Sequence, residues 1–268
     1  MTNLYFLKLG GSVITNEDRK DSAKIDNIDR LLRETYEAKK SDKFKIIIGH
    51  GGGSFPHIPA KKYRVNEGLI NKDSYLGSVI TLEAASKLDS IIMNRAIKLG
   101  IPLFSFSPHS FGTSKNGEFK VESINGIKTA LDLGFIPIVY GDVVLDTNKG
   151  VTISSTEDVF SALARKLKPQ KIIIATNVDG VFTKNPHIYK DAKLIRHVDS
   201  YNIKQVLSLA GDSVRVNVTG GMNSKLLSLY EMVSKIGSKG YIVNGDKSNL
   251  LRKILTGNDK TVECTVVK

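Results

Sequence analysis

The 268-residue chain has a single cysteine, Cys264, and no tryptophan. One thiol excludes an internal disulfide framework and is typical of a reducing compartment. The sequence also lacks a run of about 18 uninterrupted apolar residues, which a membrane-spanning helix needs. Its first residues do not resemble a secretory signal, because Lys8 and two glycines interrupt the apolar run. We therefore expect a cytoplasmic protein without a membrane partner.

Acidic residues are in the minority: 27 aspartates and glutamates face 39 lysines and arginines, a formal net charge of +12. Nucleic-acid-binding proteins concentrate such charge in a patch or stripe. Here the cations are spread over many segments, such as residues 37–43 and 235–239, and no nucleic-acid motif accompanies them. We therefore expect no nucleic-acid partner, and a dispersed positive field that attracts small anions.

Glycine is concentrated in loops that follow apolar runs. The segment His50-Gly51-Gly52-Gly53-Ser54-Phe55-Pro56-His57 follows residues 44–48, and Lys8-Leu9-Gly10-Gly11-Ser12 ends the first apolar run. A third turn, Thr219-Gly220-Gly221, precedes Lys225. Backbone N–H groups of glycine loops can converge on an anion, because no Cβ blocks its approach. Three such loops and two lysines indicate a protein that holds more than one phosphate.

Hydrophobic periodicity alternates between strand and helix along the chain. The predicted strands are residues 4–9, 44–48, 103–107, 135–140, 171–176, 240–243 and 262–267, with a hairpin over 143–153. The predicted helices are residues 25–40, 74–99, 124–133, 157–167, 201–209 and 225–236. This order indicates an α/β fold, a three-layer αβα sandwich with a central, mostly parallel sheet. Ligands of such sheets bind beyond the carboxyl ends of the strands, where the glycine loops lie.

The first loop is neither a GxGxxG nor a Walker A sequence, which disfavours a dinucleotide fold and a P-loop NTPase. The ordered motifs are Lys8-Leu9-Gly10-Gly11-Ser12, residues 50–55, Tyr140-Gly141-Asp142, residues 176–181 and residues 218–222. Together they resemble the amino-acid kinase family over nearly the whole chain. His57, residues 60–63 and residues 101–111 are similar to the family's isopentenyl phosphate kinase branch.

The resemblance implies an α/β kinase that transfers the γ-phosphoryl group of ATP to isopentenyl phosphate, a step of isoprenoid biosynthesis in a mevalonate pathway. It assigns catalysis to Lys8, His57 and Lys225. The positions it assigns to ATP are Lys8, Leu9, Gly10, Gly11, Ser12, Gly53, Asn177, Asp179, Gly221 and Lys225. The positions it assigns to the acceptor are Gly52, His57 and Thr156.

The resemblance further implies Mg²⁺ bridging the ATP phosphates without a dedicated protein site, and a homodimer. It makes residues 1–168 the acceptor-phosphate-binding lobe and residues 169–268 the ATP-binding lobe, sharing one continuous sheet. Two other functions stay open. One alternative is a related kinase that phosphorylates another small phosphate or phosphonate. The other is a non-catalytic nucleotide-binding homologue.

Several residues depart from the family pattern. Pro56 stands where a glycine usually precedes the histidine, and Thr156 replaces a substrate-contacting glycine. Glu17 occupies the place of a lysine, so we expect Arg19 or Lys20 to supply the missing charge. Asn177 and Asn217 stand where aspartates are common.

Four other assignments complete the expectations, and the last of them rests on the resemblance. Asp142 and Asp158 either orient a catalytic lysine or cap a helix. His50 is expected to have a structural role at its strand end. The helix over 74–99 is expected to wall the acceptor's hydrocarbon tail with Tyr75, Leu76, Val79, Ile80 and Glu83, or to use Val79 and Ile80 in the core.

Overall fold

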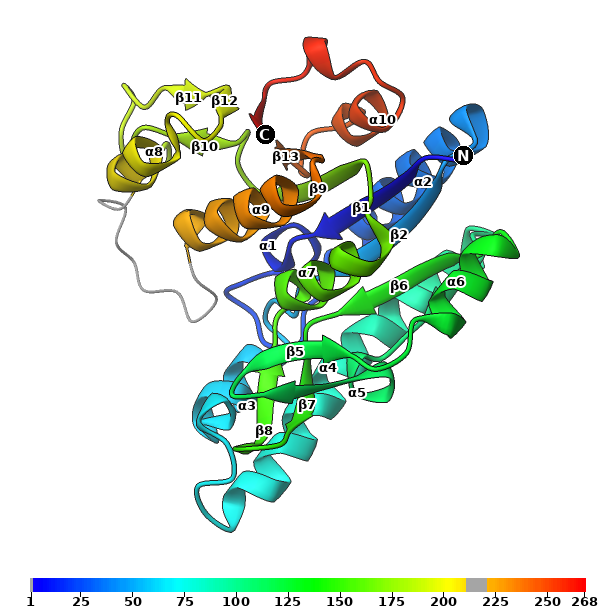
Figure 1. The fold of residues 1–268 in the computed structure, drawn as a ribbon, viewed down its shortest axis with the longest axis vertical. Helices are drawn as coiled ribbons and strands as arrows, with labels where there is room; N and C mark the ends of the chain where they lie inside the picture. Colours follow the sequence, from blue (N-terminus) through cyan, green and yellow to red (C-terminus); the bar gives the residue numbers. More distant parts are fainter. Residues whose placement is uncertain (1, 211–220) are drawn as a thin grey trace.

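The computed structural model describes residues 2–210 and 221–268. Its main sheet has eight strands in the order β12-β14-β13-β9-β1-β2-β6-β3, and only the β13–β14 pair is antiparallel. These strands are β1 (Leu4–Leu9), β2 (Lys45–His50), β3 (Leu103–Ser105), β6 (Ile136–Tyr140), β9 (Lys171–Thr176), β12 (His197–Val198), β13 (Lys239–Asn244) and β14 (Cys264–Val267). The predicted mostly parallel sheet is thus confirmed (Figure 1).

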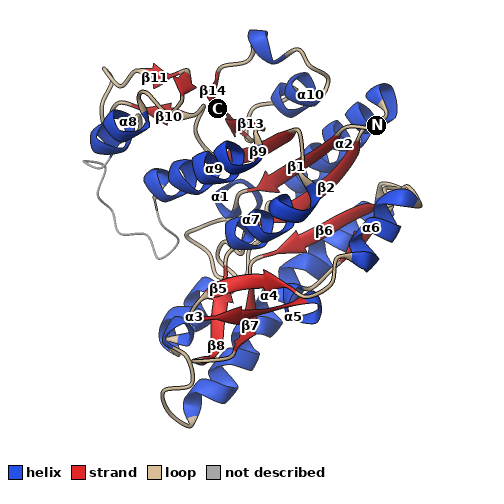
Figure 2. Ribbon diagram, in the orientation of Figure 1, coloured by secondary structure: helices blue, strands red, loops and turns tan. Residues whose placement is uncertain are grey.

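Helices cover both faces of this sheet (Figure 2). On one face lie α2 (Ile25–Asp42), α4 (Asp73–Lys98) and α10 (Leu250–Leu255). On the other lie α6 (Asn125–Asp132), α7 (Thr156–Leu167), α8 (Ile203–Ala210) and α9 (Met222–Ile236). The architecture is therefore the predicted three-layer αβα sandwich.

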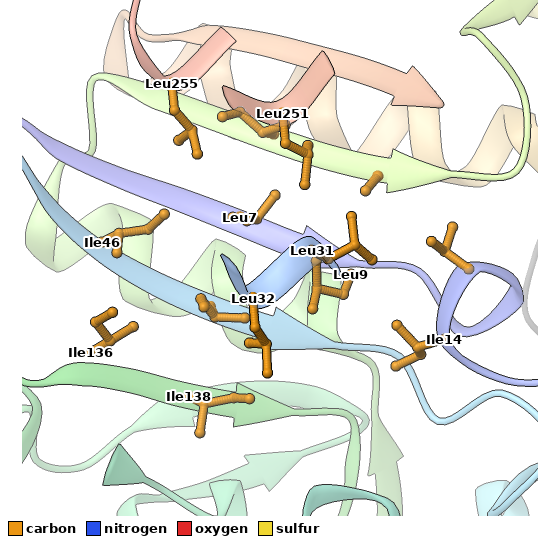
Figure 3. Close-up of a cluster of buried hydrophobic side chains, with 14 of the residues drawn as sticks. Leu7, Leu9, Ile14, Leu31, Leu32, Ile46, Ile136, Ile138, Leu251 and Leu255 are labelled. Atoms are coloured by element: carbon orange, nitrogen blue, oxygen red, sulfur yellow. The ribbon is translucent and has the colours of Figure 1, made fainter. Parts of the chain in front are cut away.

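The two hydrophobic cores follow from alternation along the strands. Leu7 and Leu9 of β1 point into the first core with Leu31 of α2 and Leu251 of α10 (Figure 3). Phe6, which directly precedes Leu7 in sequence, points into the second core. Successive side chains of a strand face opposite sides, so a strand covered on both faces is apolar at nearly every position.

A separate four-stranded sheet, in the order β5-β4-β7-β8, lies beside the main sheet. Its strands are β4 (Gly112–Lys115), β5 (Glu118–Val121), β7 (Asp142–Asp146) and β8 (Gly150–Ser154). The hairpin predicted over 143–153 is β7–β8, and β5 is an edge strand of this sheet. The carboxyl end of β6 leads directly into β7, so this small sheet projects from the edge where ligands are expected.

Short elements complete the chain: α1 (Gly11–Ile14), α3 (His57–Lys62), η1 (Val65–Glu67), α5 (Pro108–Phe111), β10 (Val181–Phe182), β11 (Leu194–Ile195) and η2 (Asp259–Thr261). Of the described helices, none combines the length and apolar character needed to cross a bilayer.

Candidate active site

A cavity of about 750 Å³ opens at the carboxyl ends of the main strands. Residues of the first and second glycine loops, of α9 and of the small sheet line it together. Nine of the predicted site residues reach it: Lys8, Gly10, Gly11, Ser12, Gly52, Gly53, His57, Thr156 and Lys225. Segments distant in sequence therefore meet where the parallel sheet was expected to bind ligands.

The first two glycine loops lie against each other at the backbone level. A Cβ on Gly11 would lie 2.7 Å from both N and Cα of Gly53, so neither loop leaves room for a side chain there. Gly53 also has φ +54°, which L-residues rarely adopt. The Thr15 hydroxyl holds the loops together, because it donates to the Gly11 carbonyl (2.8 Å) and accepts the Ser54 N–H (3.2 Å).

The start of α1 lines the cavity. Gly11 and Ser12 are its first two residues, so their N–H groups have no acceptor within the helix and can bind an anion. Lys24 Nζ donates to the Ser12 carbonyl (2.7 Å), which fixes the position of this turn.

Lys8 forms a buried ion pair with Glu157 of α7. Burial raises the pKa of Glu157, but the positive charge and hydrogen bond of Lys8 outweigh it, and the pKa stays below its ordinary value. Burial lowers the pKa of Lys225, and the charge of Lys8 lowers it further. Two lysines thus face one partly desolvated volume, where charge interactions are stronger than in water.

His57 begins α3 and lines the cavity. Burial and the charge of Lys8 lower the pKa of His57 below its ordinary value. At neutral pH the ring is therefore a neutral donor of hydrogen bonds.

Asp142 and Asp158, which were expected to orient a catalytic lysine or to cap a helix, have different contacts in the structure. Asp158 forms a capping box with Ser155 at the start of α7, so it caps a helix. Asp142 is fully buried and lies 2.6 Å from His109 Nδ1, while its other oxygen accepts the Val143 N–H. Neither forms an ion pair with a cavity lysine in the described chain; that role belongs to Glu157. Lys8 lies near the buried end of β1, beside α7. The spacing of residues in the sequence does not indicate its ion pair with Glu157.

Thr156 and His50 have structural contacts. The Thr156 hydroxyl donates to the His50 carbonyl (2.7 Å), which ties α7 to the end of β2. The His50 ring is buried, stacks on Tyr140 and has Nε2 3.4 Å from Asp89 Oδ1. The expected structural role of His50 agrees with this placement.

Four predicted nucleotide positions do not line the cavity: Leu9, Asn177, Asp179 and Gly221. The Leu9 side chain lies in the core, and Gly221 is the N-cap of α9. Asp179 accepts from Asn244 (3.1 Å) and pairs with Lys247 (2.6 Å). Thr219, Gly220 and Asn217 are outside the described residues. The roles of these positions in binding ATP stay predictions.

Two further expectations concern the first loop and α4: the approach of Arg19 or Lys20 to bound phosphate stays a prediction, and the expected α4 wall is wrong. Glu17 lines the cavity, but Arg19 and Lys20 do not, because the turn from Asn16 to Ser22 is closed by the Asn16 N–H and side chain and presents Glu17 to the site. On α4 the cavity-lining residues are Thr81 and Ala85.

The α4 residues expected to wall the acceptor's tail lie elsewhere. Tyr75, Leu76 and Val79 are more than three-fifths exposed, and Ile80 and Glu83 do not line the cavity. The core alternative fails for Val79 as well, since its side chain faces outward.

Comparison with known proteins agrees with this geometry. The model of the amino acid kinase family matches residues 3–244. The chain belongs to the amino acid kinase family. An isopentenyl phosphate kinase of Methanocaldococcus jannaschii is 32% identical over 97% of this chain and 98% of its own length. That of Methanothermobacter thermautotrophicus is 33% identical over 96% of each.

Solved structures of the amino acid kinase family give the same result. One isopentenyl phosphate kinase superposes with a TM-score of 0.84 at 29% identity, covering 99% of this chain and 100% of that chain. A second, a substrate complex, has a TM-score of 0.80 at 25% identity with the same coverage. The fold predicted from the family resemblance is therefore confirmed for the described residues.

Sequence reasoning missed several residues of this amino acid kinase site. Glu157, Thr15 and the His109–Asp142 pair were not assigned their contacts, and Lys61 and Arg64 of the α3 region also line the cavity. A signal for Lys61 was present, because it follows His57 by four residues and helical residues four apart share a face.

Proposed function

We propose that this protein transfers the γ-phosphoryl group of ATP to isopentenyl phosphate, giving isopentenyl diphosphate and ADP. One observation carries the proposal: a single cavity combines Lys8, Lys225 and two glycine loops with His57 and an apolar wall. The wall includes Ala60, Ala85, Val143 and Ile153. The named relatives supply the identity of the acceptor.

On the donor side, Lys8 and Lys225 would neutralise charge on the transferring group, with Glu157 holding the Lys8 ammonium in place. The N–H groups of Gly11 and Ser12 would bind phosphate oxygens. Phosphoryl transfer needs chiefly positioning and charge stabilisation, which this arrangement provides.

On the acceptor side, a phosphate oxygen of isopentenyl phosphate attacks the γ-phosphorus of ATP. The bond between the γ-phosphorus and the β,γ-bridging oxygen breaks, and ADP leaves. The acceptor is already an anion, so no strong general base is required. His57 would donate a hydrogen bond to its phosphate, and the Gly52 and Gly53 N–H groups would lie between donor and acceptor.

Mg²⁺ would enter with ATP. Within residues 2–210 and 221–268, no three His, Cys, Asp or Glu side chains form a metal-binding group. The cavity does present the carboxylates of Glu17 and Asp158, which are oxygen ligands suited to a partly hydrated Mg²⁺. The ion would neutralise part of the charge on the ATP phosphates.

We also propose a cytoplasmic homodimer. Tyr75, Leu76 and Val79 expose apolar surface along α4, which fits a contact between copies. Residues 1–168 are proposed as the acceptor lobe, because they supply His57 and the apolar wall, and residues 169–268 as the ATP lobe, because they supply Lys225.

A panel of alkyl phosphates and phosphonates with Mg²⁺-ATP tests the proposed function. We expect the highest kcat/KM with isopentenyl phosphate. A higher value with another acceptor would indicate a related kinase, and ATP binding without turnover on any acceptor would indicate a non-catalytic homologue.

A further inference from the structure

The cations of the cavity are unequally available to a substrate. Four of its lining residues are lysine or arginine, and two of these already have partners: Lys8 pairs with Glu157, and Arg64 with Glu67. Among the described residues, Lys61 and Lys225 line the cavity without forming an ion pair. Lys225 belongs to the proposed donor side.

On the first loop, the acidic residue Glu17 stands where the family pattern has a third positively charged side chain. Glu17 lines the cavity, whereas neighbouring Arg19 and Lys20 do not. His57 adds little charge on the acceptor side at neutral pH, because burial and Lys8 lower its pKa. A phosphate monoester carries a charge of about −1.5 to −2 at pH 7. The acceptor phosphate therefore needs another positive group.

Lys61 is placed to provide it. His57 and Lys61 occupy the first and fifth positions of α3, and both line the cavity. Helical residues four apart have Cβ atoms about 5–6 Å apart, so both side chains can reach one phosphate. The neighbouring Lys62 does not line this cavity and instead lies over the Tyr63 ring at 4.9 Å.

We propose that Lys61 binds the phosphate of the acceptor substrate. It supplies the positive charge that the first loop lacks, because Glu17 stands at the position of a lysine there. This inference rests on the proposed function. A lysine ammonium suits the task because it is a compact charge on a flexible stem. The exposed Lys61 side chain would approach the bound phosphate from α3, next to the His57 ring.

The test compares Lys61→Ala with Lys62→Ala and Lys61→Arg in steady-state kinetics with isopentenyl phosphate and ATP. Loss of a charged hydrogen bond predicts a rise of about tenfold or more in the acceptor KM of Lys61→Ala. The ATP KM should stay within about twofold, a contrast that a merely structural role would not produce. Lys62→Ala should behave as wild type, and Lys61→Arg should recover most of the acceptor binding.

Salt dependence gives a second measurement. Acceptor KM should rise with ionic strength in the wild type and rise less steeply in Lys61→Ala, because one charge contact is gone. An unchanged acceptor KM in Lys61→Ala, or an equal change in Lys62→Ala, would overturn the proposal, as would a change confined to the ATP KM. Failure of the proposed function is separate, since it appears as wild-type inactivity on isopentenyl phosphate.

If the wild type instead prefers another phosphate monoester, the same comparison applies to that acceptor. Lys61 must then again affect the acceptor KM and not the ATP KM.

Discussion

Lys8 depends on a carboxylate that is distant in sequence but in contact in the fold. Its ammonium is buried with Glu157 as partner, and desolvating one charge without the other is costly. In the proposed reaction, the ion pair with Glu157 also holds the Lys8 ammonium where it would contact the γ-phosphate of ATP.

Glu157→Gln should therefore affect stability and rate together. We expect the free energy of unfolding to fall by about 3 kcal/mol, as when one partner of a buried pair is removed. We expect kcat to fall about 10²-fold, because Lys8 is no longer held in position. Urea unfolding and steady-state kinetics measure both, with the exposed Glu83→Gln as control. Wild-type kcat in Glu157→Gln would show that the pair does not serve the reaction.

His57→Ala should lose about 2–4 kcal/mol of transition-state stabilisation, the range for removing one oxyanion donor. The dissociation constant of ATP should hardly change, since His57 is assigned to the acceptor. The control is His187→Ala, which removes an exposed imidazole outside the cavity. Near-normal turnover in His57→Ala would show that His57 does not bind the acceptor phosphate.

At the scale of elements, α4 presents different residues to the cavity and to the outside. Ala85 and Thr81 line the cavity, whereas Val79 is 61% exposed. Only the first pair can contact the hydrocarbon tail of the proposed acceptor.

Ala85→Val should shorten the tail pocket. Two added methyl groups displace about two CH₂ groups of substrate, each worth about 0.8 kcal/mol, so the kcat/KM ratio of isopentenyl phosphate to ethyl phosphate should fall about tenfold. The ratio is insensitive to a general loss of folded protein. Val79→Ala should leave it unchanged. A shift in Val79→Ala and none in Ala85→Val would place the pocket elsewhere.

The short helix α5 is joined to the start of β7 by His109 and Asp142. Hydrogen bonding to Asp142 raises the pKa of His109. A histidine with a raised folded pKa stabilises the protein fully below its unfolded pKa, about 6.5, and this contribution disappears as the pH rises through the folded pKa.

The unfolding free energies of wild type and His109→Gln should therefore differ more at about pH 6 than at about pH 9. Urea unfolding at the two pH values measures the difference. A gap that is constant with pH would show that the pair contributes no charge-dependent stability.

Long elements were predictable because periodicity extends over many residues. Strands 4–9 and 171–176 were predicted with their observed bounds, and the helix predicted over 74–99 is Asp73–Lys98. The face that α4 turns to the cavity was not predictable, since it depends on how α3 and β7 pack against the helix. Short elements such as α3 and α10 contain too few residues for a periodic signal.

At the scale of the whole molecule, the eight-stranded sheet and the four-stranded sheet together form the cavity. Apolar strands predicted the main sheet, and glycine loops predicted the edge where ligands bind. The lysine partner was not predictable: Asp142 follows a strand, Glu157 and Asp158 begin a helix, and only packing brings Glu157 to Lys8. Motif order therefore predicted the family, whereas only tertiary contacts assigned the carboxylates.

The central claim is that one cavity holds two phosphates and joins them. Phosphorus NMR of the reaction of Mg²⁺-ATP with isopentenyl phosphate tests it most directly. The account predicts that the monophosphate resonance is replaced by the two coupled resonances of isopentenyl diphosphate, with ADP appearing in equal amount. Formation of ADP and inorganic phosphate while isopentenyl phosphate stays unchanged would contradict it.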